Sequence, residues 1–264
     1  MRLKDKKAIV VGAGQTPGET TGNGRAAAIR FAQEGASVLL VDKRIESAEE
    51  TALIITKEGG EASVLGADIT IEDNCRAIAS TCLQRYGRID ILHNNVGMSE
   101  GDGSILDLSE KNWLRLLDVN LKGVFLTCKH VLPIMRGQRS GVIINISSTA
   151  SLCTRRPLAY RTAKAGLNAM TQTLALENAE YGVRVNAILP GLMDTPMAIE
   201  RRARERGVDR QAIRREREAQ VPLCHKMGTA WDVAAAAVFL ASDEASYITG
   251  VLFPVDGGLS VKIG

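Results

Sequence analysis

Short apolar runs rich in valine and isoleucine alternate along the chain with longer segments in which apolar positions recur at helical spacing. Such runs are typical of strands that are buried on both faces of a parallel sheet. Seven runs predict strands, at residues 8–11, 37–41, 62–65, 89–93, 142–146, 183–188 and 251–255. Right-handed crossovers through the intervening helices then predict an α/β fold, a doubly wound parallel sheet with helices on both faces. Ligands of such sheets bind at the carboxyl ends of the strands, where the winding direction reverses.

The composition favours a single folded unit. The 264 residues are 45% apolar and 24% charged, enough to bury one large α/β core. No Pro/Gly/Ser-rich linker, low-complexity tract or internal repeat divides the sequence, so we expect one domain over residues 1–264. The formal net charge is only +3 and aromatic residues make up 4%, so the basic, aromatic surface typical of nucleic-acid binding is not expected.

Cysteine and histidine residues give no sign of a disulfide framework or a metal site. The five cysteines are odd in number and include no C-x-x-C pair, and the three histidines are far apart. The first apolar run has four residues before a glycine, too short for a signal peptide or a membrane span. We therefore expect a cytoplasmic protein with no metal and no membrane partner.

Glycines are concentrated directly after the first predicted strand, in GAGQTPGETTGNG. A phosphate-binding turn needs glycines here so that the backbone can approach a pyrophosphate, and the next helix points its amino terminus at the negative charge. Two registers are possible. The first uses the glycines of GAGQTPG, but its helix would begin in ETTGNG, which is a poor helix former. The second uses Gly12, Gly22 and Gly24, and predicts a helix that begins near Asn23 and continues through RAAA.

We favour the second register because it also accounts for an acidic residue. Asp42 ends the second predicted strand, eighteen residues after Gly24, close to the separation at which an acid binds the adenosine ribose hydroxyls. A carboxylate there would repel the 2′-phosphate of NADP, although Lys43 follows immediately and could weaken the repulsion. The predicted cofactor is therefore NAD.

Tyr160 and Lys164 lie four residues apart in a segment of helical period, which places both side chains on one helix face. A tyrosine hydroxyl, with a reference pKa of about 10, is a poor base at neutral pH. A neighbouring ammonium favours the phenolate, and Lys164 would supply it. Ser148, just after the strand predicted at 142–146, would donate a hydrogen bond to a substrate oxygen on which charge develops.

With these motifs in place, the chain resembles the short-chain dehydrogenase/reductase family over nearly its whole length. The resemblance rests on Gly12, Gly22 and Gly24, Asp42, Asp68-Ile69, Asn94-Asn95-Val96-Gly97, Asn120, Asn145-Ile146-Ser147-Ser148, Tyr160 and Lys164, Pro190-Gly191 with Thr195, and Asp256-Gly257-Gly258. It implies a Rossmann-type fold and an NAD-dependent oxidoreductase that interconverts a secondary alcohol and a ketone. It also implies a homotetramer.

The resemblance implies a role for each site residue. Tyr160 would be the general acid/base, and Lys164 would hold the nicotinamide ribose and lower the pKa of Tyr160. Ser148 would orient the substrate, and Asn120 would anchor a proton relay through water, unless it is a buried asparagine satisfied by backbone groups. The cofactor would contact Gly12, Gly22, Asn23, Gly24, Asp42, Lys43, Asp68, Ile69, Asn94, Val96, Gly97, Tyr160, Lys164, Pro190, Gly191, Met193 and Thr195. We interpret Asp256-Gly257-Gly258 as a structural turn outside the site.

Two departures from the family pattern leave alternatives open. The family usually places its serine thirteen positions before the tyrosine, whereas Ser148 and Tyr160 are twelve apart, so Ser147 is an alternative to Ser148. The glycine turn is six residues longer than usual, as in the enoyl-acyl-carrier-protein reductase branch, which reduces a carbon–carbon double bond. That branch typically separates its tyrosine and lysine by seven positions, so the spacing of four favours alcohol and carbonyl chemistry. A third hypothesis is a catalytically idle NAD-binding sensor or scaffold.

We call residues 14–21, the segment of the glycine turn that contains the six extra residues, the glycine-loop insertion. In the second register this segment bulges from the carboxyl end of the first strand. We expect it to lie over the pyrophosphate, with its backbone N–H groups and the hydroxyls of Thr16, Thr20 and Thr21 as donors. The competing interpretation is an inert surface loop.

Arginines near the expected substrate end suit an anionic substrate. Arg155 and Arg156 lie between Ser148 and Tyr160, and residues 196–225, the expected substrate lid, contain eight arginines. An arginine fork binds a carboxylate, sulfonate or phosphate well. The same lid contains five acidic residues, so much of this charge could instead pair on a solvated helix.

Overall fold

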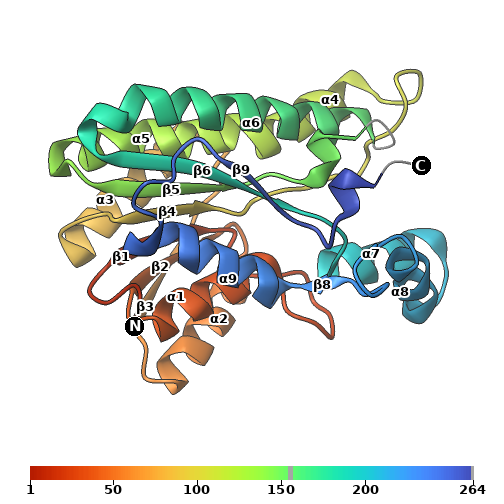
Figure 1. Cartoon of the computed structure of the whole chain (residues 1–264), viewed down its shortest axis with the longest axis horizontal. Helices are drawn as coiled ribbons and strands as arrows, with labels where there is room; N and C mark the ends of the chain where they lie inside the picture. The colour runs from red at the N-terminus through yellow and green to blue at the C-terminus, as the bar shows by residue number, and fades with distance from the viewer. Residues whose placement is uncertain (154–156, 263–264) are drawn as a thin grey trace.

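A parallel β-sheet forms the centre of the fold. The computed structural model describes residues 1–153 and 157–262, and within them seven parallel strands form one sheet in the order β3-β2-β1-β4-β5-β6-β9 (Figure 1). The strands are β1 (Lys7–Val11), β2 (Ser37–Asp42), β3 (Ala62–Gly66), β4 (Ile91–Asn94), β5 (Gly141–Ile146), β6 (Val183–Pro190) and β9 (Leu252–Val255). All seven predicted strands are confirmed, with ends that differ by at most two residues from the prediction.

Helices cover both faces of the sheet, as predicted. One face carries α1 (Asn23–Gln33), α2 (Ile45–Lys57) and α9 (Ala230–Ala241), and the other carries α3 (Glu72–Tyr86), α5 (Gly123–Gln138) and α6 (Leu158–Asn178) (Figure 1). Before α5, α4 (Glu110–Leu117) continues through a π-helical turn, η1 (Asp118–Lys122). Single 3₁₀ turns follow several elements: η2 (Thr149–Ser151), η3 (Ala179–Tyr181), η4 (Asp243–Ala245) and η5 (Leu259–Val261).

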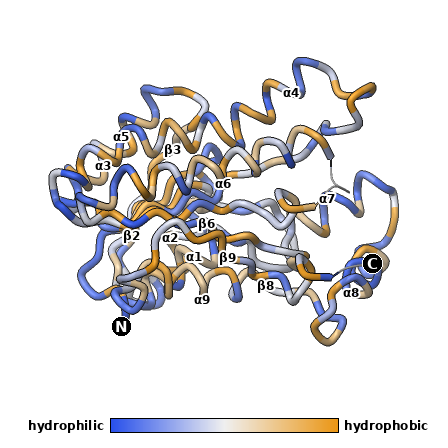
Figure 2. Tube along the Cα trace, turned by 45° about the horizontal axis from the view of Figure 1, so that its top comes forward, coloured by the Kyte–Doolittle hydropathy of each residue, from blue (hydrophilic) through white to orange (hydrophobic). Residues whose placement is uncertain are grey.

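The core consists of two hydrophobic layers, one on each side of the sheet. Val10 packs in the layer with Phe31 of α1, whereas Leu92 belongs to the layer with Ile78 of α3 and Leu167 of α6. Figure 2 shows hydrophobic residues concentrated in the central strands. Because both faces of these strands are covered, their side chains are buried in both directions, which explains the nearly continuous apolar runs in the sequence.

The strand order places a crevice between β1 and β4. The chain winds from β1 outward to β3 and then returns to the other side of β1 to form β4. Connections on opposite faces therefore leave the carboxyl ends of β1 and β4 in opposite directions, and the gap between them is where such sheets bind ligands. This topology fixes the position of the candidate site.

An additional two-stranded ladder lies after β6. Its strands, β7 (Met193–Asp194) and β8 (Gly228–Thr229), are too short for the sequence pattern to predict. Between them, α7 (Pro196–Arg206) and α8 (Arg210–Glu218) form a helical segment beyond the carboxyl end of β6 (Figure 1). Among the described helices, none is both long and apolar enough to cross a membrane.

Candidate active site

A cavity of about 1000 Å³ lies where the carboxyl ends of β1, β4, β5 and β6 meet. Pockets for organic ligands usually measure about 300–1000 Å³, so this one has room for a dinucleotide with a small substrate beside it. Most residues that the sequence predicted for the site line it: Gly12, Gly22, Asn23, Gly24, Asp42, Lys43, Asp68, Ile69, Val96, Gly97, Ser148, Tyr160, Lys164, Pro190, Gly191, Met193 and Thr195.

The glycine turn follows the second of the two registers. Gly12 has a φ of +77°, which strongly favours glycine, and its N–H donates to the carbonyl of Val41 at 2.7 Å. A Cβ on Gly24 would lie 1.8 Å from the carbonyl oxygen of Gly12, so only glycine fits there. Helix α1 begins at Asn23, with Gly22 as its N-cap, and both residues line the pocket. Unbonded N–H groups of a first helical turn attract an anion, and glycine at the cap leaves them accessible to one.

The glycine-loop insertion is held at its base by Gln15. The Gln15 backbone N–H donates to Ser47 Oγ at 2.9 Å, and its side-chain oxygen accepts the N–H of Gly22 at 2.9 Å. The insertion is thus anchored to α2 and to the start of α1. Gly14, Gln15 and Thr16 line the pocket, whereas Thr20 and Thr21 are not among the described residues that line it, so of the three expected hydroxyl donors only Thr16 faces the pocket.

Asp42 faces the pocket from the end of β2. Its Oδ2 accepts the N–H of Gly14 at 2.9 Å, and its Oδ1 accepts the N–H of Arg44 at 3.0 Å. The neighbouring Lys43 pairs with Asp68 at 2.6 Å. Partial burial raises the pKa of Asp68, but hydrogen bonds from Lys43 and Thr70 outweigh this and hold that pKa below its usual value. The Asp68 carboxylate therefore remains ionised at neutral pH.

The pocket wall formed by the residues at and after the end of β4 differs from the prediction at Asn94. Asn94 is buried behind the pocket, where its amide donates to Asn145 Oδ1 at 3.0 Å and its oxygen accepts from Thr127 Oγ1 at 2.9 Å. Asn94 is not among the described residues that line the pocket, whereas Asn95 is. Successive side chains along a strand alternate between its two faces, which explains why one asparagine is turned into the protein and the next is not.

Tyr160 and Lys164 lie one turn apart on α6 and both line the pocket. Lys164 Nζ is 5.8 Å from the centre of the Tyr160 ring. The same nitrogen donates to the carbonyl of Ile146 at 2.7 Å and to that of Val96 at 3.4 Å. Burial lowers the pKa of Lys164 to about 7, and the two carbonyl groups act in the opposite direction because they stabilise the ammonium.

Asp102 holds the first turn of α6, although nothing in the sequence around it indicated this role. Its carboxylate accepts the N–H of Ala159 at 3.0 Å and the N–H of Tyr160 at 2.8 Å. The N-cap of this helix is Pro157, which has no side-chain acceptor of its own. A residue more than fifty positions earlier therefore caps the helix at the turn that carries Tyr160.

The two serines after β5 have different environments. Ser147 also lines the pocket, but it is buried and its hydroxyl is already used, because it donates to the carbonyl of Lys164 at 3.2 Å. Ser148 lines the pocket together with Tyr160, and its Oγ accepts the N–H of Ala150 at 3.1 Å. A hydroxyl that accepts one hydrogen bond still has its own O–H to donate. The geometry therefore favours Ser148 as the residue that faces a ligand.

Asn120 lies in the π-helical turn and is buried. Its side-chain oxygen accepts the N–H of Met98 at 3.0 Å, and its amide donates to the carbonyls of Met98 and Leu116, both at 2.8 Å. A Cβ on Gly97 would lie 3.3 Å from Asn120 Oδ1 and 3.5 Å from Lys164 Nζ, so both side chains lie close to Gly97. Asn120 is not among the described residues that line the pocket, and its side chain is occupied by backbone groups.

Arginines of α7 and α8 line the far end of the pocket. They are Arg201, Arg202 and Arg217. Arg201 donates to Ser99 Oγ at 2.9 Å and thereby joins α7 to the loop after β4. The predicted substrate arginines, Arg155 and Arg156, lie outside the described residues.

The turn formed by Asp256-Gly257-Gly258 is structural, as interpreted from the sequence. Asp256 accepts the N–H of Gly258 at 3.0 Å and that of Ser260 at 2.7 Å. A Cβ on Gly191 would lie 2.6 Å from that of Asp256, so this turn supports the backbone after β6 from behind. None of the three residues is among the described residues that line the pocket.

The fold and the pocket together define a doubly wound α/β protein with a glycine-rich turn in the same pocket as a tyrosine–lysine pair. Residues 18–260 match the family model described as enoyl-(acyl carrier protein) reductase. The chain is 36% identical to 3-oxoacyl-(acyl-carrier-protein) reductase FabG of Thermotoga maritima, over 99% of this chain and 100% of that protein. It is 35% identical to glucose 1-dehydrogenase 2 of Bacillus subtilis, over 98% of this chain and 96% of that protein.

A solved structure of a short-chain dehydrogenase/reductase from Burkholderia xenovorans is similar over the full length. It is 40% identical and superposes with a TM-score of 0.94, covering 100% of this chain and 99% of that chain. The chain therefore belongs to the short-chain dehydrogenase/reductase family. As such it is an oxidoreductase that uses a nicotinamide cofactor and acts on CH–OH or keto groups.

Proposed function

We propose that the protein is an NAD-dependent oxidoreductase that interconverts a secondary alcohol and a ketone. The observation that carries this proposal is the meeting of Ser148, Tyr160 and Lys164 in the same pocket as the glycine turn and Asp42. The first three supply proton transfer and polar contacts to an alcohol, and the other two suit a dinucleotide. A bound nicotinamide ring would supply the hydride acceptor.

In the oxidising direction the phenolate of Tyr160 takes the proton of the substrate hydroxyl. The Lys164 ammonium beside the ring favours the phenolate, and the carbonyls of Ile146 and Val96 keep that ammonium in place. Ser148 donates its O–H to the substrate oxygen, where negative charge develops as the proton leaves. In the reducing direction Tyr160 returns the proton to the same oxygen.

Asn120 contributes to the proposed site through its place in the π-helical turn η1. Because its side chain binds Met98 and Leu116, we propose that any link to a proton relay uses its backbone carbonyl within the π-helical turn. π-Turns inside α-helices are frequent at functional sites because they leave the regular hydrogen-bond pattern. The side chain holds the loop after β4 against the helix that follows.

The preference for NAD rests on Asp42. Each carboxylate oxygen accepts one backbone N–H, and an oxygen with two lone pairs can still accept a ribose hydroxyl. A 2′-phosphate would bring a charge of about −2 against this carboxylate. The two neighbouring cations have other partners, since Lys43 pairs with Asp68 and Arg44 donates to the carbonyl of Gln15 at 2.8 Å. Asp68 therefore offsets the charge of Lys43, whereas Arg44 keeps its charge and compensates only part of the repulsion.

We propose that residues 196–225 form a substrate lid within a single domain, and that the substrate carries an anionic group. Arg201, Arg202 and Arg217 support the second part because these three cationic residues line the pocket. This extends the sequence hypothesis, which named Arg155 and Arg156, to described residues of the lid. Equal KM changes for a carboxylate substrate and its neutral amide in Arg201→Ala would contradict anion recognition.

Two alternatives compete with this function. Enoyl reductase activity is favoured by the description of the matching family model and by the long glycine turn. The Tyr160–Lys164 pair argues against enoyl reductase activity, because the two residues are four positions apart on one helix face and not seven. A catalytically idle nucleotide-binding protein is the other alternative, and any measurable turnover would exclude it.

The direct test is a turnover screen with NAD and NADP over sugars, hydroxy acids, steroids and cyclic alcohols. An enoyl thioester with the reduced cofactors serves as the comparison. We expect oxidation of a secondary alcohol with NAD and no such activity in the Tyr160→Phe variant. Reduction of the enoyl substrate alone would contradict the proposal.

We further propose a homotetramer in the cytoplasm, as is usual in the family. Light scattering coupled to size-exclusion chromatography measures the oligomeric state directly. A monomer at micromolar concentration would contradict the tetramer.

A further inference from the structure

The tip of the glycine-loop insertion packs against the proposed lid. A Cβ on Gly18 would lie 2.7 Å from Glu200 Cγ and 2.8 Å from Pro196 Cβ, so glycine is required for this close approach. Pro196 and Glu200 belong to the first turns of α7. The base of the insertion, by contrast, lines the cofactor pocket through Gly14, Gln15 and Thr16. One continuous segment therefore touches both the pocket and the lid.

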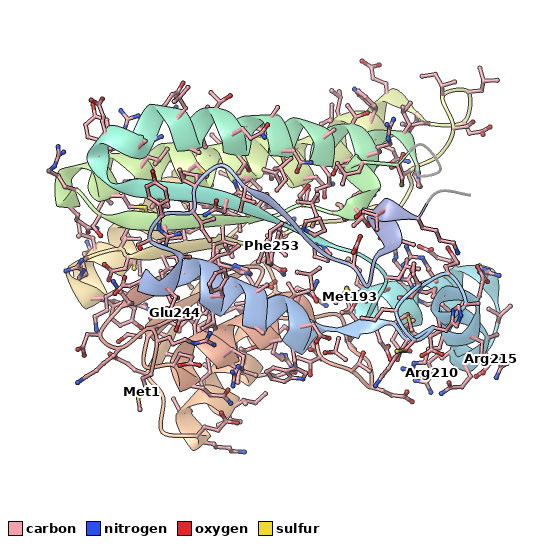
Figure 3. The ribbon with its side chains drawn as sticks, in the orientation of Figure 1. Met1, Met193, Arg210, Arg215, Glu244 and Phe253 are labelled. Atoms are coloured by element: carbon pink, nitrogen blue, oxygen red, sulfur yellow. The ribbon has the colours of Figure 1, made fainter. Side chains whose placement is uncertain are left out.

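Glu19, the residue after Gly18, connects the insertion to the lid through ion pairs. Its Oε1 lies 3.0 Å from Arg210 Nη2, and its Oε2 lies 3.5 Å from Arg214 Nη1. Both arginines belong to α8, and Figure 3 shows Arg210 in this segment. The Glu19 backbone N–H also faces Glu200 Oε1, at 3.4 Å. A single carboxylate of the insertion thus pairs with two cations of the lid.

The same two arginines hold acidic residues at the base of the lid. Arg210 pairs with Glu200 at 3.3 Å, and Arg214 pairs with Asp194 of β7 at 3.2 Å. The Arg214 side chain is only 12% exposed, so solvent screens its interactions less than those of a free surface pair. Networks of this kind contribute more than isolated surface pairs. Glu19 is the member of this network that comes from the cofactor side.

We propose that Glu19 is a positioning residue that holds the lid over the cofactor pocket and couples nucleotide binding to lid closure. The coupling runs through the insertion, whose Gly14 N–H donates to Asp42 at 2.9 Å and whose Gln15 orders the N-cap Gly22. A nucleotide that orders the base of the insertion also orders its tip and so favours the closed lid. By thermodynamic linkage, closing the lid raises the nucleotide affinity by the same factor by which the bound nucleotide raises the equilibrium constant for lid closure. The inference rests on the proposed lid and nucleotide site, and it assigns a role to the insertion.

The test compares Glu19→Gln with Glu216→Gln as a matched control. Glu216 pairs with Arg206 at 2.7 Å inside the lid segment, so its loss removes an ion pair without touching the insertion. Two measurements are made without substrate: the Kd for NAD by calorimetry, and hydrogen–deuterium exchange of peptides within 196–218 with and without NAD. For Glu19→Gln we expect an NAD affinity weaker by about two- to fivefold and a matching loss of lid protection.

Charge reversal gives a second, independent comparison. Glu19→Arg places a third cation beside Arg210 and Arg214, and we expect a larger loss of lid protection than with glutamine. Arg210→Glu alone also removes the pair with Glu200, so it is measured as a reference; adding it to Glu19→Arg restores opposite charges between positions 19 and 210 and should recover part of the protection that the two single variants lose. Recovery of this kind distinguishes positioning by charge from general damage to the loop.

Three results would overturn the proposal. They are unchanged affinity and exchange in Glu19→Gln, equal effects of Glu19→Gln and Glu216→Gln, and a wild-type lid whose exchange does not respond to NAD. None of these measurements requires turnover. A protein that binds NAD with a protected lid but oxidises no alcohol would refute the proposed reaction and leave the role of Glu19 intact.

Discussion

The capping of α6 by Asp102 offers a direct test of how the helix that carries Tyr160 is positioned. Asp102 Oδ1 accepts the N–H groups of Gly103 at 2.9 Å and Ala159 at 3.0 Å, and Oδ2 accepts the N–H of Tyr160 at 2.8 Å. Replacement by alanine leaves two N–H groups of the first helical turn without this acceptor. Because Pro157 precedes them, no neighbouring side chain of the helix can substitute for it.

The expected cost follows from the two helical contacts. Loss of an N-terminal cap typically costs about 0.5–2 kcal/mol, and we expect the upper half of this range because one carboxylate serves two helical N–H groups. For a chain of this size such a loss lowers the Tm by about 2–6 °C. Tyr160 occupies the loosened turn, so we also expect kcat to fall by about tenfold, with a smaller change in KM.

Calorimetry and steady-state kinetics on Asp102→Ala and Asp102→Asn measure both effects. The asparagine keeps one carbonyl acceptor and should recover part of the stability and part of kcat. An alanine variant with the Tm and the kcat of the wild type would refute the argument. If the alanine variant does not fold, the asparagine variant provides the test, because its Tm and its kcat should both be measurably lower than those of the wild type.

Three further predictions concern other residues. Tyr160→Phe should lower kcat by at least about 100-fold with little change in the Kd for NAD, and near-normal turnover would remove Tyr160 from its role. Asp42→Ala should reduce the preference of kcat/KM for NAD over NADP by at least about tenfold, and a wild type that already prefers NADP would contradict the role of Asp42. Burial lowers the pKa of His93 to about 3, so below about pH 6.5 only the unfolded state gains this proton and stability falls by up to about 1.4 kcal/mol per pH unit. His93→Leu should therefore lose less stability than the wild type in urea unfolding between about pH 6 and pH 4, and parallel losses would contradict this.

The strands and the glycine register could be predicted because their signals are local. A strand buried on both faces must be apolar at nearly every position, and this leaves a run that can be counted in the sequence. The choice of Gly12, Gly22 and Gly24 followed from helix propensity, and the structure places Gly24 directly against the carbonyl of Gly12. The spacing of Tyr160 and Lys164 likewise follows from helix geometry alone.

The directions in which the Asn94 and Ser147 side chains point depend on tertiary packing. Both occur in motifs that can be recognised in the sequence, but a motif does not state which way each side chain turns. Asn94 faces a buried network with Asn145 and Thr127, and Ser147 faces the backbone of α6. Orientation depends on which neighbouring strand or helix covers each face, and those neighbours are distant in sequence.

The sequence by itself determined the fold class, the glycine turn and the tyrosine–lysine pair, because each depends on residues within a few turns or one strand of each other. Only the tertiary structure brought Asp102 to the start of α6 and Glu19 to Arg210 and Arg214. These contacts join residues that are 57 to 195 positions apart. A charged side chain at a loop position has the same local pattern whether it meets solvent or a distant partner. Its partner is decided when the sheet places the carboxyl ends of its strands together, which no short stretch of sequence encodes.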